Sequence, residues 1–282
     1  MNAVGAHTPG HLADLAVQAL VDEALLTPKP ALVDRRGSGA HRDLNLGLLL
    51  ASAAALRADF ERMADSAQQR RPSLELREEL GDIGRSAEAA MLAATGGSNA
   101  HRGAIWTLGL LVAALAMCTP GATLADIAAA SAALAQLPDR AASAPMSNGL
   151  RACARYGVEG ARGEARAGFP HVIEVGLPAL RRTRCGGADE CAAQLDALMA
   201  IMASLEDTCL LHRGGRRAVS AAQVGAREVL RLGGSATPAG RARLLELDAD
   251  LMARWVSPGG AADLLAACLL LDKATLEKSW NN

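Results

Sequence analysis

Residues 103–118 have the sequence GAIWTLGLLVAALAMC, which contains no Asp, Glu, Lys or Arg and is followed by Thr-Pro-Gly at 119–121. A membrane-spanning helix needs about 20 apolar residues, so this shorter stretch predicts a helix in the core of a folded protein. Residues 44–56 and 261–271 are also apolar on nearly every face. Because such helices have to be covered on all sides, the sequence predicts three central helices inside a shell of amphipathic ones.

The composition predicts an all-α fold. The chain contains 62 Ala and 43 Leu, the two commonest helix formers, against 33 Val, Ile, Thr and aromatic residues together. No linker is long enough to separate domains, so we expect one globular multi-helix domain over residues 1–282. The P-loop, zinc-protease and nucleophile-elbow motifs are absent from the sequence.

The charge balance argues against several kinds of partner. The chain has 29 basic and 30 acidic residues, hence a net charge of −1, which gives no electrostatic footprint for nucleic acid. No basic segment followed by an apolar stretch stands at the N-terminus, and the six cysteines form no C-x-x-C pair. We therefore expect a cytoplasmic protein that binds neither nucleic acid nor a membrane.

Helical periodicity covers most of the chain. We expect helices at residues 10–26, 43–68, 73–95, 101–118, 122–137, 147–156, 171–181, 189–212, 217–233, 239–255 and 260–278. Five segments concentrate glycine and charge and hold four of the six histidines: 27–43, 96–103, 157–171, 207–215 and 257–263. Helical proteins usually build sites where helix ends and loops meet, so we expect these Gly-rich segments to form one site.

Two of these segments place positive charge where a helix begins. His41-Arg42 and His101-Arg102 each precede an apolar helix. A helix N-terminus carries about half a positive charge, so a cation there forgoes on the order of 0.3–1 kcal/mol that an acid would gain. A bound anion would reverse the sign of this effect. Solvated arginines and packed histidines explain the same pattern, and both interpretations stay open.

Two acidic residues stand in unusual places. Asp263 follows residues 257–260, Ser-Pro-Gly-Gly, a helix start whose glycines leave backbone N–H groups open to a phosphate. It is expected to stabilise the helix dipole or to hold Mg²⁺ or a ribose hydroxyl. Asp207 falls late in the predicted helix 189–212, where an acid is unfavourable, so a metal ion or Arg213 is its expected partner. These features predict an α-helical enzyme that binds a multiply phosphorylated small molecule, with Mg²⁺ as its expected metal.

The glycine- and charge-rich segments also contain short motifs in a fixed order. They are LTPKPxLVDR at 26–35, SGAHxD at 38–43, NxHRGAI at 99–105, GxxGxRGEAxxGFP at 157–170, DT at 207–208, RGG at 213–215 and SPGGxADLLA at 257–266. Together these motifs resemble the triphosphoribosyl-dephospho-coenzyme A synthase family over residues 26–266. Arg36-Gly37 stands where the citrate lyase branch of that family has an Asn-containing variant, which favours the malonate decarboxylase branch.

The resemblance implies a reaction in which ATP and 3′-dephospho-coenzyme A give 2′-(5″-triphosphoribosyl)-3′-dephospho-coenzyme A and adenine. The N-glycosidic bond of ATP breaks, the triphosphate stays attached, and the 2′-hydroxyl of the dephospho-coenzyme A ribose is the acceptor. The product is the precursor of a prosthetic group that an acyl carrier subunit of malonate decarboxylase or citrate lyase carries. A Mg²⁺-dependent all-α nucleotide hydrolase is the alternative among enzymes, and a helical scaffold that binds coenzyme A or an acyl carrier is the alternative outside them.

This chemistry resembles glycoside hydrolysis and needs a base, an acid and cations. The expected bases are Asp34, Glu164 and Asp207, and the expected acids that protonate adenine are His41 and His101. The expected contacts to the substrates and their phosphates are Lys29, Arg35, Ser38, Arg102, Arg162, Arg213, Gly214, Gly259 and Gly260. Asp207 and Asp263 are the expected ligands of Mg²⁺.

Overall fold

The computed structural model describes residues 7–119, 121–142 and 147–276 and shows a helical protein without strands over these ranges, which confirms the predicted fold class. Its helices are α1 (Pro9–Leu25), α2 (Leu46–Ala55), α3 (Arg57–Ala67), α4 (Leu74–Ala94), α5 (Arg102–Met117), α6 (Leu124–Gln136), α7 (Asn148–Tyr156), α8 (Gly160–Arg166), the π-helix η1 (His171–Gly176), α9 (Leu177–Cys185), α10 (Glu190–Met202), α11 (Thr208–Arg231), α12 (Pro238–Ala253) and α13 (Gly259–Leu276). None of the helices in the described part of the chain is both long and apolar enough to cross a bilayer.

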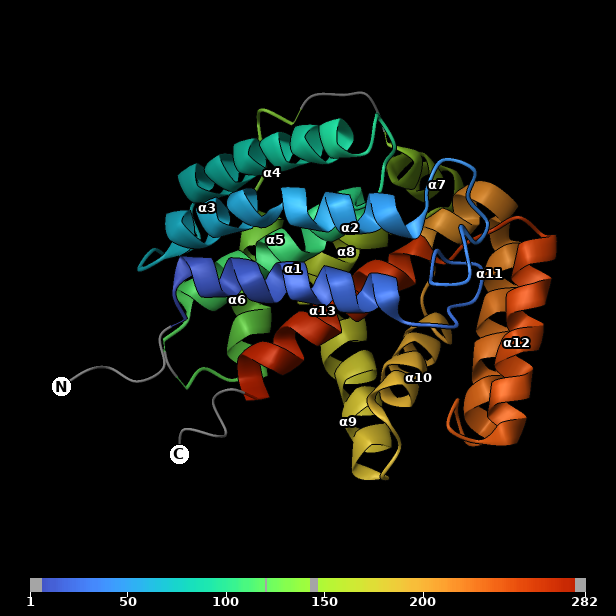
Figure 1. The fold of residues 1–282 in the computed structure, drawn as a ribbon. Coiled ribbons are helices and arrows are strands. Elements are labelled where there is room, and N and C mark those ends of the chain that lie inside the picture. The colour runs from blue at the N-terminus through green and yellow to red at the C-terminus, as the bar shows by residue number, and fades with distance from the viewer. Residues whose placement is uncertain (1–6, 120, 143–146, 277–282) are drawn as a thin grey trace.

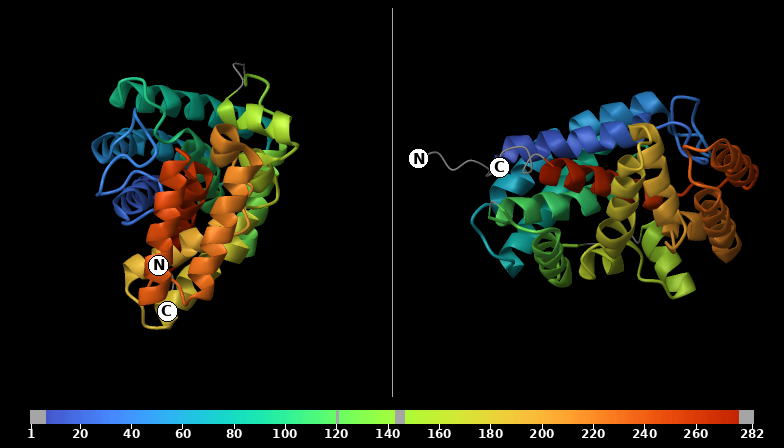
Figure 2. Two further views of the ribbon diagram at one scale, coloured as in Figure 1. Left: turned by 90° about the vertical axis from the view of Figure 1, so that its right-hand side faces the viewer. Right: turned by 90° about the horizontal axis from the view of Figure 1, so that it is seen from below.

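The helices form a layered bundle with two projecting helix pairs (Figure 1). The first four helices pack against one another, with α5 and α13 on the inner side of α1 and α3. The pairs α9–α10 and α11–α12 extend away from this bundle in Figure 1, and Figure 2 shows the same arrangement from two further directions. The loop between α1 and α2, residues 26–45, lies beside α12 at this side of the molecule (Figure 1).

Two of the three predicted central helices occupy the core. Helix α5 is buried at almost every residue from Ala104 to Leu115, and α13 packs against α1, α5, α10 and η1. The prediction for residues 44–56 was wrong. Helix α2 fully buries only Leu49, Ser52 and Ala53, and its remaining residues are partly buried or exposed, because it contacts its neighbours α1 and α4 along one side. An apolar sequence therefore did not require a central position here.

The helix boundaries differ from the prediction at functional segments. The predicted helix 43–68 is divided at Leu56 into α2 and α3, and the predicted helix 189–212 stops at Met202, before α11 begins at Thr208. The segment 157–171, expected to be irregular, contains α8 and the first residue of η1. Gly215 lies inside α11 with φ 65° and ψ −165°, so the Gly-Gly pair kinks a helix and does not end it. Residues 277–278 of the last predicted helix lie outside the described ranges.

Candidate active site

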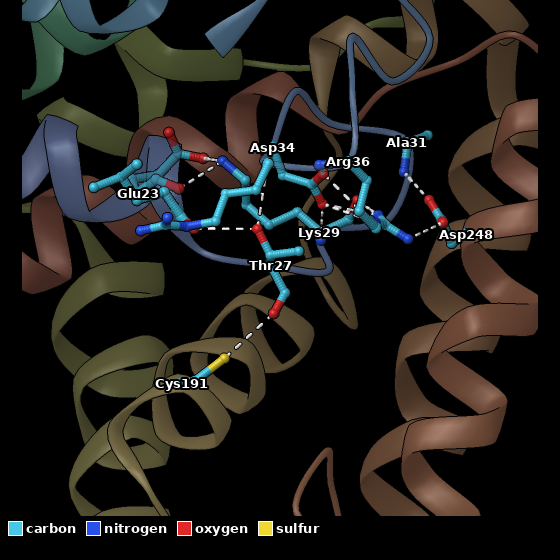
Figure 3. A network of polar contacts seen from close by, with 10 residues as sticks. Glu23, Thr27, Lys29, Ala31, Asp34, Arg36, Cys191 and Asp248 are labelled. Atoms are coloured by element: carbon cyan, nitrogen blue, oxygen red, sulfur yellow. Dashed lines mark hydrogen bonds and ion pairs between the residues drawn. The ribbon is translucent and has the colours of Figure 1, made fainter.

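The loop at residues 26–45 is held in shape by buried ion pairs (Figure 3). Lys29 is only 1% exposed, and its Nζ donates to Oε1 and to the backbone oxygen of Glu23, both at 2.5 Å. Asp34 accepts from the backbone N–H groups of Lys29 at 2.9 Å and of Arg36 at 2.7 Å, and also from the Arg36 guanidinium. The side chain of Lys29 therefore ties the loop to Glu23 of α1, and that of Asp34 is occupied within the loop, so that both fix its conformation.

Arg36 joins this loop to α12. Its guanidinium lies 2.8 Å from Asp34 and 2.6 Å from Asp248, and Asp248 also accepts from the backbone N–H of Ala31 at 2.7 Å (Figure 3). Ser38 follows on the partly exposed side of the same loop. The Asp248 carboxylate thus connects α12 to the loop through two donors, the Arg36 guanidinium and the Ala31 N–H.

Asp207 is the N-cap of α11, so its predicted place late in a long helix was wrong. Its Oδ1 accepts from the backbone N–H groups of Cys209 at 2.7 Å and Leu210 at 3.3 Å, and its Oδ2 accepts from that of Ala261 at 2.9 Å in the first turn of α13. Burial raises the pKa of Asp207, and these N–H donors oppose the shift. One carboxylate, 3% exposed, thus caps two helices, and Arg213 is not its partner.

The glycines near this carboxylate allow close packing. A Cβ on Gly259 would lie 3.0 Å from Cys209 Sγ, and one on Gly260 would lie 3.1 Å from the Asp207 carboxylate. A Cβ on Gly214 would lie 2.6 Å from a side chain of its own helix. Close packing alone therefore accounts for glycine at these three positions, whatever contact they make with a ligand.

Asp263 rests on the start of α5. A Cβ on Gly103 would collide with its carboxylate, and the backbone N–H of Ala104 donates to it. The pKa of Asp263 is raised well above its usual range, first by burial and then by the nearby carboxylates of Glu23 and Asp207. Its side chain remains partly exposed. A carboxyl group with two carboxylates nearby and a single backbone donor is suited to bind a cation.

The acidic residues fit a metal ion that arrives with a substrate better than a resident metal centre. No group of three or more His, Cys, Asp and Glu side chains in the described residues is arranged to hold a metal ion. Both oxygens of Asp207 accept from N–H donors, whereas Asp263 accepts from a single backbone N–H, that of Ala104. Mg²⁺ bound to a nucleotide commonly takes one or two protein carboxylates and completes its shell with phosphate and water. Asp263 alone fits that requirement.

His41 is held in one neutral tautomer by two neighbours. Arg213 Nη2 donates to its Nδ1 at 3.3 Å, and because a guanidinium can only donate, the imidazole proton lies on Nε2. That nitrogen then donates to Ser257 Oγ at 2.9 Å, which also accepts from Arg213 Nη1 at 2.8 Å. Ser257 therefore orients His41. Burial and the Arg213 charge lower the pKa of His41 to about 4.

His101 is also neutral. It is 4% exposed, its Nδ1 lies 2.7 Å from Ser52 Oγ, and its Nε2 has no hydrogen-bond partner among the described residues. Burial, followed by the charge of Lys29, lowers the pKa of His101 to about 4. The two histidines that were expected to protonate adenine thus carry no charge near pH 7 in the free protein. Their assignment as acids stays a prediction.

Glu164 contacts His171, which was not among the predicted site residues. Its Oε1 accepts from the backbone N–H of His171 and its Oε2 from His171 Nδ1, both at 2.8 Å. The hydrogen bond and charge of Glu164 raise the pKa of His171 above its ordinary value. The spacing Glu-x₆-His was visible in the sequence, but the irregular backbone expected there gave no reason to place the two side chains together.

The predicted phosphate-binding arginines differ in whether a carboxylate already binds them. Arg102 donates to Glu88 at 2.9 Å. Arg35 binds a backbone oxygen of α1 through its Nε, and Arg162 is exposed. Within the described ranges, no carboxylate pairs with Arg35, Arg162 or Arg213. These three guanidinium groups are the ones left available to an anion.

The N-terminal ends of α5, α11 and α13 converge. Asp207 joins the starts of α11 and α13, and Asp263, in the second turn of α13, rests on the start of α5. Each helix N-terminus carries about half a positive charge, and Arg213 adds a charge without a carboxylate partner beside Ser257. The region combines backbone dipoles, a guanidinium and a carboxyl group with a single backbone donor, which is an arrangement suited to a metal–polyphosphate ligand.

Comparison with known proteins identifies relatives over almost the whole chain. The model of the CitG family, described as ATP:dephospho-CoA triphosphoribosyl transferase, matches residues 9–282. The 2-(5″-triphosphoribosyl)-3′-dephosphocoenzyme-A synthase of Klebsiella pneumoniae is 55% identical over 262 residues, which cover 93% of this chain and 94% of the relative. A protein of Pseudomonas fluorescens named "Probable 2-(5″-triphosphoribosyl)-3′-dephosphocoenzyme-A synthase" is 59% identical over 263 residues, covering 93% and 90%. No solved structure matches this one.

Proposed function

Because the chain belongs to the CitG family of ATP:dephospho-CoA triphosphoribosyl transferases, we propose that it makes the prosthetic-group precursor of a malonate decarboxylase. The chain is a transferase that uses ATP as its triphosphoribosyl donor. In the proposed reaction the bond between ribose C1′ and adenine N9 breaks, and the 2′-hydroxyl of 3′-dephospho-coenzyme A forms a new bond to C1′. Both substrates are intracellular nucleotides, which favours the cytoplasm as its location.

The convergence of three helix starts beside Arg213 is the observation that supports triphosphate binding. Arg213 is held beside this region by hydrogen bonds from its Nη1 to Ser257 Oγ at 2.8 Å and to the backbone oxygen of Ala40 at 3.0 Å. Arg35 and Arg162 have no carboxylate partner among the described residues either, whereas Lys29 and Arg102 bind Glu23 and Glu88. We therefore propose that Arg35, Arg162 and Arg213 bind the phosphates and that Lys29 has the structural role of shaping the loop.

Mg²⁺ enters this proposal as part of the substrate, bound to ATP. Asp263 would contribute one carboxylate oxygen, and the ion would neutralise charge on the triphosphate. Its binding would also relieve the repulsion from Glu23 and Asp207 that raises the pKa of Asp263. Asp207 keeps its place as the shared cap of α11 and α13.

The transferase assay omits each component in turn. Purified protein is mixed with ATP, Mg²⁺ and 3′-dephospho-coenzyme A, free adenine is followed by chromatography, and the acceptor is followed by mass spectrometry. We expect adenine only when both substrates are present, together with a triphosphoribosyl adduct on the acceptor. Adenine or phosphate released without the acceptor would instead support the nucleotide hydrolase, and a tight complex without turnover would support the binding scaffold.

Phosphate binding is tested by Arg213→Gln, with Arg217→Gln as the matched control four residues along the same helix. A charge-assisted hydrogen bond contributes about 1.5–3 kcal/mol, or roughly 10–100-fold in affinity. We expect KM for ATP to rise by about that factor in Arg213→Gln and to stay unchanged in Arg217→Gln, whose side chain is exposed. Equal effects in both variants would remove Arg213 from the proposed site.

The malonate branch rests on Arg36. Its ion pairs with Asp34 and Asp248 connect the loop to α12, and an Asn at this position could not span both carboxylates. The product would pass toward the acyl carrier subunit of the decarboxylase. Deletion of the gene should abolish growth on malonate and leave the use of citrate unchanged; the reverse phenotype would assign the chain to the citrate lyase branch.

A further inference from the structure

The carboxylate of Glu164 holds His171 at two points. One oxygen accepts from the backbone N–H of His171 and the other from its Nδ1, each at 2.8 Å. Because a carboxylate can only accept, Nδ1 keeps its proton whether the ring is charged or neutral. The second nitrogen, Nε2, has no hydrogen-bond partner among the described residues, and the side chain is 23% exposed. The orientation leaves Nε2 free for proton exchange with a ligand.

The backbone around this pair is unusual. Gly168 and Phe169 have φ values of 81° and 60°, and Phe169 is fully buried in that left-handed conformation. His171 then begins η1, a π-helix of six residues. Positive φ at a bulky residue is uncommon and, like π-helical turns, occurs often at functional sites. The two residues with positive φ lie between Glu164 and His171, and the π-helix begins at His171 itself.

Helix α8, which carries Glu164, is fixed against the proposed substrate region. The Trp106 indole N–H of α5 donates to the backbone oxygen of Ala161 at 3.2 Å. Gly160 packs so closely on Thr208, the first residue of α11, that a Cβ would lie 2.9 Å from its methyl group. Helix α8 is therefore attached near the starts of α5 and α11, two of the three converging helices.

The elements packed against η1 bring no competing charge to His171 in the described part of the chain. Arg181 and Arg184 of α9 both bind Asp272 of α13, and Asp196 of α10 accepts from Ser235 and Thr183. Cys268 of α13 is a buried neutral thiol whose pKa is raised by burial. Glu164 is thus the charged group that acts on the imidazole, and it raises the pKa of His171, opposite to the shifts of His41 and His101.

We propose that His171 is the general acid that protonates adenine as it leaves the ribose, and that Glu164 is its positioning residue. The C1′–N9 bond breaks with its electron pair going to the base, a ring nitrogen of adenine takes the Nε2 proton, and the hydroxyl oxygen of dephospho-coenzyme A bonds to C1′. The proton lost by that hydroxyl returns to His171 through water, so the reaction restores the protonated histidine. This inference rests on the proposed function and replaces the base role expected for Glu164.

The test uses the full-length protein and two variants of different geometry. In His171→Asn the amide nitrogen takes the place of Nδ1, which preserves the bond to Glu164 but removes Nε2. In His171→Gln the amide nitrogen takes the place of Nε2, which preserves a neutral donor but removes the titratable proton. Glu174→Gln, on an exposed position of η1, is the matched control.

We expect kcat of His171→Asn to fall about 100-fold or more, with KM for ATP and Tm nearly unchanged, and Glu174→Gln to match the unmodified protein. The kcat of the unmodified protein should decline at high pH as His171 loses its proton. That decline should move to lower pH in Glu164→Gln and be absent in His171→Gln. With 2-fluoro-ATP, whose base leaves more readily, the loss in His171→Asn should shrink.

Product formation by the unmodified protein separates the two proposals. If the unmodified protein makes the triphosphoribosyl adduct while His171→Asn and His171→Gln both stay within threefold of its kcat, the acid role is overturned and the transferase stands. An equal loss with ATP and 2-fluoro-ATP would also overturn the acid role, because a purely structural defect does not depend on the leaving group.

Discussion

His101 and His171 make nearly the same contact and have opposite properties. Each presents Nδ1 to one oxygen, at 2.7 Å in His101 and 2.8 Å in His171. The oxygen belongs to the Ser52 hydroxyl in the first case and to the Glu164 carboxylate in the second. The pKa of His101 is lowered to about 4 and that of His171 is raised. The distance of a hydrogen bond therefore says little about the charge state of a histidine, which depends on burial and on the charge of the partner.

The largest expected effect is on stability at low pH. The pKa of His101 falls from 6.5 in the unfolded chain to about 4 in the fold. Its neutral form therefore adds stability that is complete above pH 6.5 and is lost as pH falls from 6.5 to about 4. The shift corresponds to about 3 kcal/mol. Chemical denaturation of the unmodified protein and of His101→Asn should show their difference in unfolding free energy changing by about this amount between pH 7 and 4.

His212→Asn is the control for that measurement. His212 is exposed on α11, so its replacement should leave the difference in unfolding free energy constant across the same pH range. Parallel loss of stability in the unmodified protein and His101→Asn would mean that His101 is not neutralised by burial.

Replacing Ser52, the hydroxyl partner of His101, tests how much this hydrogen bond contributes to stability. Ser52→Ala leaves Nδ1 of His101 buried without a partner, which costs about 1–3 kcal/mol. Ser220→Ala, at an exposed position of α11, should change the unfolding free energy by less than about 0.5 kcal/mol. Urea denaturation at pH 7 measures both; equal values for the two variants would show that Ser52 does not support His101.

Removing the carboxylate partner should make His171 more like an ordinary histidine. Because the folded-state pKa of His171 is raised, its pair with Glu164 adds stability below pH 6.5 that is lost as pH rises through the folded pKa. Glu164→Gln should lower the pKa of His171 in an NMR titration, and Glu174→Gln should not. An unchanged His171 titration in Glu164→Gln would contradict the assigned cause.

The smallest expected effect is on the pKa of His41, which is lowered mainly by burial and, to a lesser extent, by the charge of Arg213. Arg213→Gln removes the charge and keeps an amide donor, so the pKa of His41 should rise but remain below 6.5. The same NMR titration follows it. A rise to 6.5 or above would mean that the Arg213 charge, and not burial, controls this histidine.

The sequence predicted the elements of the fold better than their ends. The apolar stretches of α5 and α13 indicated their central position, because a helix without a polar face is usually covered on all sides, but the same reasoning failed for α2. The break before α11 was missed because residues 203–206, Ala-Ser-Leu-Glu, contain neither Gly nor Pro. Asp207 was consequently assigned to a helix C-terminus, although Asp is a favoured N-cap residue.

Contacts between distant segments limited the prediction of the site. Ser52 and His101 are 49 residues apart, and Arg213 and His41 are 172 apart, so no local pattern relates them. The charge-rich segments were identifiable by residue type, but the contacts of Lys29 with Glu23 of α1 and of Asp34 within the loop depend on the three-dimensional path of the loop. Glu164 and His171, seven residues apart, were within reach of local reasoning.

The double cap at Asp207 also has a consequence for how the protein opens. Its carboxylate binds the amides of Cys209 and Leu210 in α11 and of Ala261, 54 residues from the carboxylate, in α13. Neither helix start can fray without exposing a charge that the other start helps to hold. These amides should therefore exchange with deuterium through one shared opening, so that two distant helices behave as one cooperative unit.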